Sequence, residues 1–423
     1  MESSDILILG AGASGLSAAR RLSEAGKTVI VLEARNRIGG RIDTRQLPGF
    51  SIPIERGAEF IHGNLPFTRK LAREAGVSLR RGGGRAYRID GGKASAADLF
   101  PGMDKLVRAL KALKQDMPIG KFLDTHFAGD DYRQLREQTK LFVQGFDAAD
   151  INKASAFGLR DEWSQEDEDQ QYHPNGGYGQ LMEFMAERAK RAGAQIHLNT
   201  VVSEIRWSEG HVEAVTQQGT HFTARQVIIT IPPAVLRSGA VTFTPALPNQ
   251  ARALSQIETG GVIKFVVEFH EPVWERSGFR PMHDLHFIFS DAAVPTWWTQ
   301  RPLKTPLITG WLSGPPAQHA PAGEDALWDM ATRSLGYLLG CPALKVKRAV
   351  RAFAIANWVH DPFALGAYTY KGLQTQDAVR MLGEPVADTL YFAGEAFDTG
   401  NAMGTVEAAL NSGFHVANRC LDV

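Results

Sequence analysis

The stretch that most constrains the fold of this chain is Asp5–Glu33, close to the N-terminus. It starts with the unbroken apolar run ILIL, which is typical of a strand buried on both faces. The glycine-rich turn GAGASG (10–15) follows, and apolar residues take helical spacing from Ser14 onward. A second apolar run, Thr28–Leu32, ends on Glu33. The order of strand, glycine turn, helix, strand and acid predicts a βαβ unit that binds a dinucleotide.

The residues of this unit have separate predicted tasks. Gly10 permits the tight turn, Gly12 lets backbone amides approach a pyrophosphate, and Gly15 lets the helix pack closely on the strand. The helix N-terminus suits a diphosphate because it carries partial positive charge and free N–H donors. Glu33 is placed to accept hydrogen bonds from a ribose diol, which favours FAD or NAD over NADP.

Composition narrows the class of protein. The 423 residues predict two domains, and 46 basic residues balance 46 acidic ones, so no basic field for nucleic acid or an anionic membrane is expected. No run of 18 apolar residues occurs, no secretory leader is visible, and the cysteines are Cys341 and Cys420. We expect a cytoplasmic globular protein with no membrane span, disulfide framework or metal site.

The middle of the chain predicts a change in secondary structure. From Pro66 to about Ala192 the pattern is mostly helical, and strands return at Gln195. The run Val227–Ile231 is typical of a doubly buried strand, so we expect the chain to re-enter the nucleotide-binding sheet there. The acidic cluster at 166–169 would either attract a cationic substrate or, as most charge runs do, form a solvated loop.

A second glycine-rich turn lies near the C-terminus. The strand predicted at Thr389–Ala393 enters Gly394–Phe397, and the loop 400–404 leads into a helix of small residues from about Val406. This arrangement offers another helix N-terminus to an anionic or electron-rich group of a ligand.

Lys264 has an unusual position in the alternating strand VIKFVVEF (262–269). It lies between valines on one face of a strand that is otherwise suited to a protein core. A buried ammonium is costly unless it is hydrated or paired. The pattern alone therefore favours a half-exposed sheet in which this lysine faces solvent.

Several motifs together resemble the flavin-dependent amine oxidases, the family of monoamine and polyamine oxidases. A glycine fingerprint alone is widespread, but this set of motifs in this order is specific and extends along the whole chain. The matching segments are GAGASG with Glu33, EARNRIGGR (33–41), GAEFIHG (57–63), PNGGYGQL (174–181), the strand 200–205, IITIPP (228–233), VIKF (262–265), WVHDPFALGAYTY (358–370) and YFAGEAFDTGNAMGTVEAALNSG (391–413).

The resemblance implies an α/β fold with two domains. A Rossmann-like FAD-binding domain would be assembled from the three segments 1–65, 174–245 and 350–423. An α+β substrate-binding domain would be inserted as residues 66–173 and 246–349.

The resemblance also implies the contacts of FAD. The ADP half is expected at the first glycine turn and Arg41, and the ring is expected near the second turn. The complete set of expected cofactor residues is Gly10, Gly12, Ala13, Ser14, Gly15, Glu33, Ala34, Arg35, Gly40, Arg41, Gly57, Ala58, Glu59, Val202, Trp358, Gly394, Glu395, Thr405 and Val406. Ala367 stands where covalently flavinylated relatives carry the attaching cysteine, so we expect FAD to be bound non-covalently.

Three residues are implied to act in catalysis. Lys264 matches the lysine that binds a water next to flavin N5 and assists reoxidation by O2, which favours a buried position for it. His62 matches a histidine that contacts the substrate amine in several polyamine oxidases. Tyr368 matches one wall of an aromatic cage around the amine. The opposite wall falls on Asn401, a departure from the family pattern, and Phe60 is a further candidate for the substrate pocket.

These implications predict an oxidase that converts a primary or secondary amine to an imine and reduces O2 to H2O2. Two alternatives stay open. An amino-acid oxidase or a desaturase could share the fold, and the former needs an arginine for the substrate carboxylate, for which Arg80, Arg81, Arg85 and Arg280 are available. A flavoprotein scaffold with little turnover is the other alternative. The sequence gives no indication of the oligomeric state.

Overall fold

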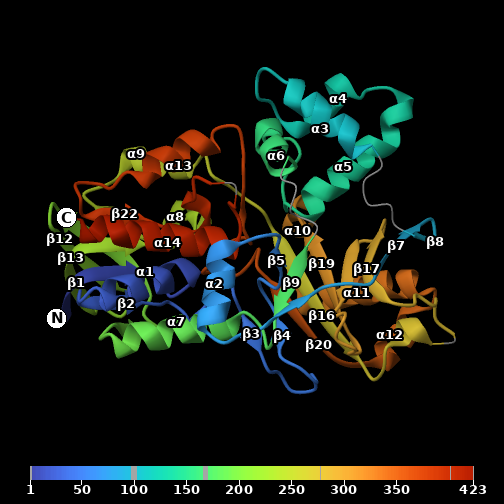
Figure 1. Cartoon of the computed structure of the whole chain (residues 1–423), viewed down its shortest axis with the longest axis horizontal. Helices are drawn as coiled ribbons and strands as arrows, with labels where there is room; N and C mark the ends of the chain where they lie inside the picture. The colour runs from blue at the N-terminus through green and yellow to red at the C-terminus, as the bar shows by residue number, and fades with distance from the viewer. Residues whose placement is uncertain (1, 97–101, 165–169, 277, 401, 423) are drawn as a thin grey trace.

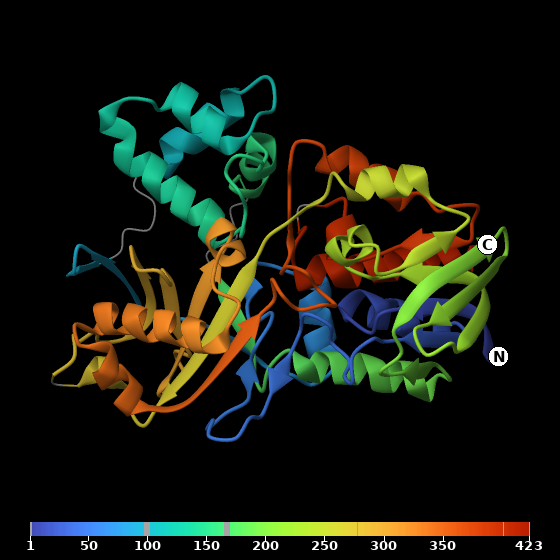
Figure 2. The ribbon, with the colours of Figure 1, turned by 180° about the vertical axis from the view of Figure 1, so that it is seen from behind.

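The computed structural model describes residues 2–96, 102–164, 170–276, 278–400 and 402–422. Two lobes lie side by side, and each is built around a large sheet (Figure 1). A group of helices, α3 to α6, stands over the second lobe, as the view from behind also shows (Figure 2). The fold is therefore a mixed α/β architecture, as the sequence predicts.

The first sheet has the N-terminal strand β1 (Glu2–Leu9) at its centre. Its parallel neighbours are β2 (Val29–Leu32) and β13 (His221–Ile229). Among the described residues the strand order is β10-β2-β1-β13-β12-β11-β14, and β22 also pairs with β13. The other strands are β10 (Gln195–His197), β11 (Val202–Ser208), β12 (His211–Thr216), β14 (Thr242–Thr244) and β22 (Leu390–Phe392). Three separated stretches of the chain thus meet in one sheet, as the predicted fold class requires.

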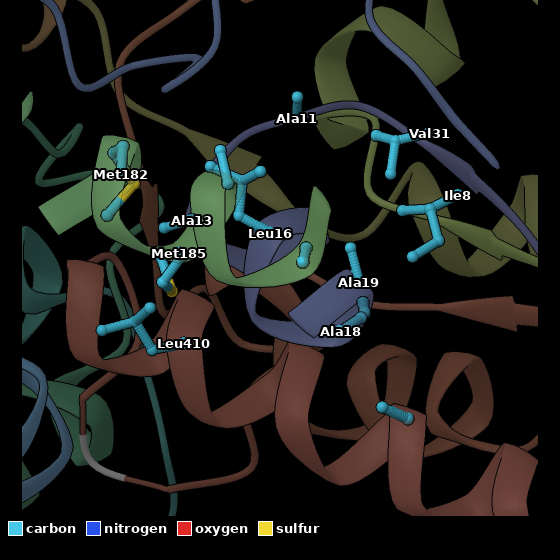
Figure 3. Close-up of a cluster of buried hydrophobic side chains, with 14 of the residues drawn as sticks. Ile8, Ala11, Ala13, Leu16, Ala18, Ala19, Val31, Met182, Met185 and Leu410 are labelled. Atoms are coloured by element: carbon cyan, nitrogen blue, oxygen red, sulfur yellow. The ribbon is translucent and has the colours of Figure 1, made fainter. Parts of the chain in front are cut away.

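Both faces of this sheet are buried because alternate side chains of β1 enter different cores. Ile6 and Ile8 join one cluster, and Leu7 and Leu9 join the other. Figure 3 shows the first cluster, in which helix α1 packs between two other helices. The helices on this face are α1 (Ala13–Glu24), α7 (Gly179–Arg191) and α14 (Val406–Leu421). Elements that pack around the second cluster include α8 (Pro233–Arg237), α9 (Pro248–Leu254) and α13 (Thr375–Gly383).

The second sheet has the order β20-β16-β19-β18-β17-β7-β8 among the described residues. Its strands are β7 (Arg85–Asp90), β8 (Lys93–Ala96), β16 (Val262–Phe269), β17 (Leu285–Ser290), β18 (Thr296–Thr299), β19 (Leu307–Ser313) and β20 (Val350–Asn357). Ile263, Phe265 and Val267 of β16 pack with α11 (Glu324–Leu339) and α12 (Ala343–Ala349) in one apolar core. The opposite face of β16, which carries Lys264, is left to face the first lobe.

The helical group has a core of its own, which includes Leu106, Phe122, Val143 and Leu159. Its helices are α3 (Met103–Ala112), α4 (Ile119–His126), α5 (Arg133–Gly145) and α6 (Ala156–Glu162), with a short turn η1 (Asp130–Tyr132) before α5. The remaining helices and turns are α2 (Pro66–Glu74), α10 (Pro315–Gln318), η2 (Val273–Glu275) and η3 (Glu395–Phe397). The remaining strands form three small sheets: β3 (Thr44–Arg45) with β4 (Ile54–Glu55), β15 (Glu258–Thr259) with β21 (Thr369–Tyr370), and β5 (Ile61–His62) with β9 (Gln171–Pro174) and β6 (Leu79–Arg81).

Two expectations differ from the observed elements. The region from Pro66 to Ala192, predicted to be mostly helical, also contains the strands β6 to β9. Strand β7 forms because it pairs with β17, some 200 residues further on, and such a partner is invisible to local periodicity. Strand β20 begins at Val350, where a segment of the FAD-binding domain was expected, but it pairs with β16 in the second sheet.

Helix α1 lies unusually close to its neighbours at two glycines. A Cβ atom added to Gly15 would lie 2.0 Å from the carbonyl oxygen of Gly10, and one added to Gly413 in α14 would lie 2.1 Å from that of Ser14. The hydroxyl of Ser17 donates to the carbonyl of Leu410 at 2.8 Å. These contacts fasten the two ends of the chain together and bring the first turns of α1 and α14 to one place.

We predict that Gly413→Ala lowers the free energy of unfolding by about 3 kcal/mol, because its methyl group would overlap backbone atoms of α1. Urea denaturation measures this quantity. Gly383→Ala is the control, since Gly383 is also a helical glycine, the last residue of α13, but a Cβ there has open space. That control should be neutral or slightly stabilising. Equal stability of the two variants would contradict the close packing of α1 and α14.

Candidate active site

A cavity of about 1700 Å³ lies between the two lobes. Its lining includes the glycine turn before α1, the second glycine turn before α14, the Lys264 face of β16, and residues of α5 and α6. Apart from Gly15, every residue predicted to contact the cofactor lines this cavity, and so do Lys264, Tyr368, His62 and Phe60. Asn401 lies outside the described residues. One cavity therefore collects residues that the sequence distributes over the whole chain.

The end of the cavity near α1 has the features that a dinucleotide requires. Both oxygens of Glu33 are held by backbone N–H groups, Oε2 by that of Ala11 at 2.7 Å and Oε1 by that of Arg35 at 2.9 Å. Each oxygen keeps a second lone pair for a ribose hydroxyl. The N-cap of α1 is Gly12, which has no capping side chain, and the buried hydroxyl of Ser14 has no hydrogen-bond partner among the described residues. These unsatisfied donors fit the oxygens of a diphosphate.

An ion pair joins the loop that follows β2 to the second glycine turn. Arg41 Nη1 lies 2.7 Å from Glu395 Oε1 and also donates to the carbonyl of Ala367. Glu395 is buried and in addition accepts from the hydroxyl of Thr369 at 3.2 Å. After the second glycine turn, the hydroxyl of Thr405 caps α14 by accepting a hydrogen bond from a backbone N–H of the first turn of this helix. Arg41 is thus held at the cavity wall by the second turn.

Lys264 is buried at this wall, with 1% of its surface exposed. Its Nζ lies 2.6 Å from Glu59 Oε2 and 3.0 Å from the carbonyl oxygen of Gly57, and 5.6 Å from the centre of the Trp298 ring. The expectation of a solvent-facing lysine, drawn from strand alternation alone, is therefore wrong. The carboxylate that compensates the charge comes from a distant loop, so the strand pattern gives no sign of it.

The other oxygen of Glu59 is also fully engaged. Oε1 accepts hydrogen bonds from Trp298 Nε1 at 3.0 Å and Gln300 Nε2 at 2.7 Å, and His173 Nδ1 lies 3.7 Å away. Burial raises the pKa of Glu59, but the Lys264 ammonium, His173 and the hydrogen bonds outweigh it and lower the pKa to about 2. Glu59 is consequently a carboxylate at all ordinary pH values.

The pKa of Glu55 is shifted in the opposite direction, upward. Its oxygens accept from the backbone N–H of Tyr178 at 2.6 Å and the hydroxyl of Thr44 at 2.8 Å. Burial nevertheless raises the pKa of Glu55 to about 7. The pKa values of these two neighbouring carboxyl groups are thus pushed apart: below about pH 7 Glu59 is ionised while Glu55 holds its proton.

Three histidines near Glu59 are kept neutral. Burial lowers the pKa of His62, His173 and His286 to about 4 in each case. His62 and His286 line the cavity, and the His62 ring lies 5.6 Å from that of Phe60 between ring centres. A neutral imidazole can accept a hydrogen bond from an amine, whereas an imidazolium cannot.

Aromatic side chains form one wall of the cavity. The Tyr368 ring stacks on Trp311, with ring centres 6.5 Å apart and planes inclined by 21°. The Tyr368 hydroxyl donates to the carbonyl of Phe146, and burial raises its pKa. Trp298 continues the wall, 5.8 Å from Trp311. We define Tyr368, Trp311 and Trp298 as the aromatic wall.

Trp298 and Trp311 were not among the site residues expected from the sequence. Trp311 lies directly opposite Lys264 in the β16–β19 pairing, and Trp298 faces the same side from β18. Alternation within a strand shows only which residues share one of its faces. That the faces with Trp298 and Trp311 lie beside Lys264 follows only from the register in which the strands pair.

Two acidic side chains also line the cavity near Tyr368, namely Asp147 and Glu162. They are hydrogen-bonded to each other, and burial raises the pKa of Glu162. The acidic cluster noted in the sequence, at 166–169, falls outside the described residues. None of the four arginines considered for a substrate carboxylate lines the cavity; Arg88 does.

Within the described ranges of the chain, every helix is too short or too polar to cross a membrane. No group of three or more His, Cys, Asp or Glu side chains in this part of the chain could hold a metal ion.

Comparisons with known proteins agree with this geometry. The profile of the family described as "Flavin containing amine oxidoreductase" matches residues 13–421. Polyamine oxidase 4 of Oryza sativa subsp. japonica is 26% identical, over 98% of this chain and 88% of the relative. Lysine-specific histone demethylase 1B of Mus musculus is also 26% identical over 98% of this chain, which spans 52% of that longer relative.

Solved structures share the fold. A wild-type putrescine oxidase bound to putrescine superposes with a TM-score of 0.81 at 21% identity, covering 100% of this chain and 99% of that one. Cyclohexylamine oxidase from Brevibacterium oxydans IH-35A gives a TM-score of 0.80 at 20% identity, with 99% of both chains covered. The predicted fold class is confirmed.

The raised pKa of Glu55 leads to a prediction about stability. The folded protein keeps a proton up to about pH 7 that an unfolded chain releases near its ordinary pKa of 4.5. The stabilisation is complete below pH 4.5 and is lost as the pH rises through 7. Glu55→Gln should therefore flatten the decline of the unfolding free energy over this interval, as measured by urea denaturation.

Glu183→Gln, on the exposed side of α7, is the control and should leave the slope as in the parent. The same slope in both variants would show that Glu55 is ionised in the folded state.

Proposed function

Because the chain belongs to the flavin-containing amine oxidoreductases, we propose that it oxidises a primary or secondary amine to an imine and passes the electrons to O2, giving H2O2. The imine would hydrolyse to an aldehyde and ammonia or a smaller amine. The observation that carries this proposal is the single cavity in which two glycine-lined helix starts, a buried lysine and an aromatic wall come together.

FAD, the cofactor of this family, would supply the two-electron chemistry by accepting a hydride from the carbon next to the amine nitrogen. The uncapped first turn of α1 and the oriented carboxylate of Glu33 would hold its ADP half. Arg41 would contact the diphosphate of that half, and its partner Glu395 and the start of α14 would hold the part nearer the ring. Non-covalent binding is supported by Ala367 in the cavity wall and by the absence of Cys341 and Cys420 from the cavity lining.

The residues around the aromatic wall would bind and orient the amine. Tyr368 and Trp311 offer ring faces and exclude water, and neutral His62 can accept a hydrogen bond from the amine nitrogen. Asp147 and Glu162 place negative charge in the cavity, which favours a cationic substrate over an anionic one. A diamine or polyamine is consequently a better candidate than an amino acid.

This assignment predicts that anaerobic mixing with putrescine, spermidine or cyclohexylamine bleaches the flavin absorbance of the purified protein. Amino acids should bleach it far more slowly, because their carboxylate would meet the negative charge of the Asp147–Glu162 pair near Tyr368. Stopped-flow absorbance measures both rates. Bleaching by amino acids alone would favour the amino-acid oxidase instead, and a flavin that no amine reduces would favour the scaffold.

A second prediction concerns Lys264. Replacing it, as in Lys264→Met, should slow reoxidation of the reduced protein by O2 about 100-fold, because the charge that stabilises developing negative charge on oxygen is gone. Reduction by the amine should change much less and serves as the internal control. Stopped-flow mixing with oxygenated buffer gives the first rate constant. Equal reoxidation rates in the two proteins would remove Lys264 from this role.

A further inference from the structure

Glu59 was predicted to lie beside the cofactor, and it lines the cavity, but both of its oxygens are committed to protein donors. Lys264 occupies Oε2, while Trp298 and Gln300 occupy Oε1. These donors come from strands β16 and β18 and the residue just after β18, so the second sheet holds this carboxylate from two sides. A carboxylate fixed in this way is better suited to orient Lys264 than to bind a ligand itself.

The ammonium of Lys264 has three N–H donors. Two of them are directed at Glu59 Oε2 and the carbonyl of Gly57. The third has no acceptor among the described residues, and Lys264 lines the cavity. Two fixed contacts therefore set the direction in which the remaining donor is available.

We propose that Glu59 is a positioning residue for Lys264: anchored by Trp298 and Gln300, it keeps the buried amine in its charged form and directs one N–H into the cavity. This inference rests on the proposed function, because it concerns the reaction with O2. A buried ammonium without a counter-charge tends to release its proton, and the carboxylate 2.6 Å away opposes that release.

The oxygen half-reaction explains why the charge matters. O2 takes up two electrons from the reduced cofactor and two protons, and H2O2 leaves. Negative charge develops on the oxygen as electrons arrive, so a fixed ammonium beside it lowers the barrier, whereas a neutral amine does so far less. Glu59 would thus act on the reaction through Lys264 without touching oxygen.

Other titratable groups face this pair from four neighbouring segments. Arg80 of β6 is cationic, and His173 of β9 and His286 of β17 are neutral because burial lowers the pKa of each to about 4. Glu55 of β4 is the group that titrates in the neutral range, with a pKa raised by burial to about 7. A pH dependence can therefore be assigned to Glu59 and Lys264 only if it persists when Glu55 is replaced by glutamine.

The test is the pH dependence of reoxidation in Glu59→Gln, whose amide keeps the size and one acceptor oxygen but loses the charge and the second acceptor. In the parent, the rate constant with O2 should be flat between about pH 6 and 9. In E59Q it should fall with rising pH towards the level of K264M, because the buried amine has lost the carboxylate 2.6 Å away that favours its charged form. The same fall in E59Q/E55Q and a flat profile in E59Q/K264M would assign the effect to this pair.

Chemical reduction of the flavin with dithionite separates this inference from the proposed function. If no amine reduces the flavin, the proposed function fails, but the oxygen reaction of the dithionite-reduced protein still tests Glu59. A flat profile in E59Q, parallel to that of the parent, overturns the inference alone. Trp298→Phe loosens Glu59 without removing its charge, and it should shift the profile in the same direction by a smaller amount. This variant replaces E59Q if the latter binds FAD too weakly to measure.

A second readout needs no cofactor. In the FAD-free protein, E59Q should lower the urea midpoint strongly, since it leaves a buried ammonium without a counter-charge. In the K264M background the same substitution should lower the midpoint much less. Additive effects of the two substitutions would show that Glu59 does not hold the Lys264 charge, and would contradict the inference.

Discussion

The structure depends on a close approach of backbones between the two ends of the chain. Helix α1 rests on the carbonyl of Gly10 at Gly15, and α14 rests on α1 at Gly413, with no room for a side chain at either contact. The N-termini of both helices consequently open onto one cavity. Hydrogen bonds such as that from Ser17 to Leu410 fix this arrangement over a separation of 393 residues. A dinucleotide long enough to span both helix starts is the ligand that this geometry suits.

The second lobe supplies what the first one lacks. A nucleotide-binding sheet can hold a cofactor but does not by itself determine the chemistry. The face of β16, β18 and β19 adds to the cavity the buried ammonium of Lys264 and two rings of the aromatic wall, Trp298 and Trp311. The charge of Lys264 is tolerated inside the protein because Glu59 compensates it and is itself satisfied by Trp298 and Gln300. The charge of Lys264 therefore depends on the packing of Trp298 and Gln300, which hold Glu59 in place.

The sequence predicts the first sheet and the strand 262–269 of the second lobe, but not how distant strands of the second lobe pair, for a physical reason. The glycine turn, Glu33 and the doubly buried strands are local patterns, and the structure has β1, β2 and β13 where they were expected. The environment of Lys264 depends instead on register between strands far apart, so alternation within one strand assigned it to solvent. The motifs of the amine oxidase family corrected that assignment. Trp298, Trp311 and the Asp147–Glu162 pair escaped notice because only tertiary pairing brings them to the cavity.

The most direct measurement of the central claim is a structure of the protein with FAD bound, from which the position of flavin N5 relative to Lys264 Nζ can be read. The account predicts a diphosphate at the start of α1, a ring close to the start of α14, and N5 within reach of Nζ through one shared water. A diphosphate bound elsewhere, or an Nζ that lies in bulk solvent when FAD is present, would contradict it.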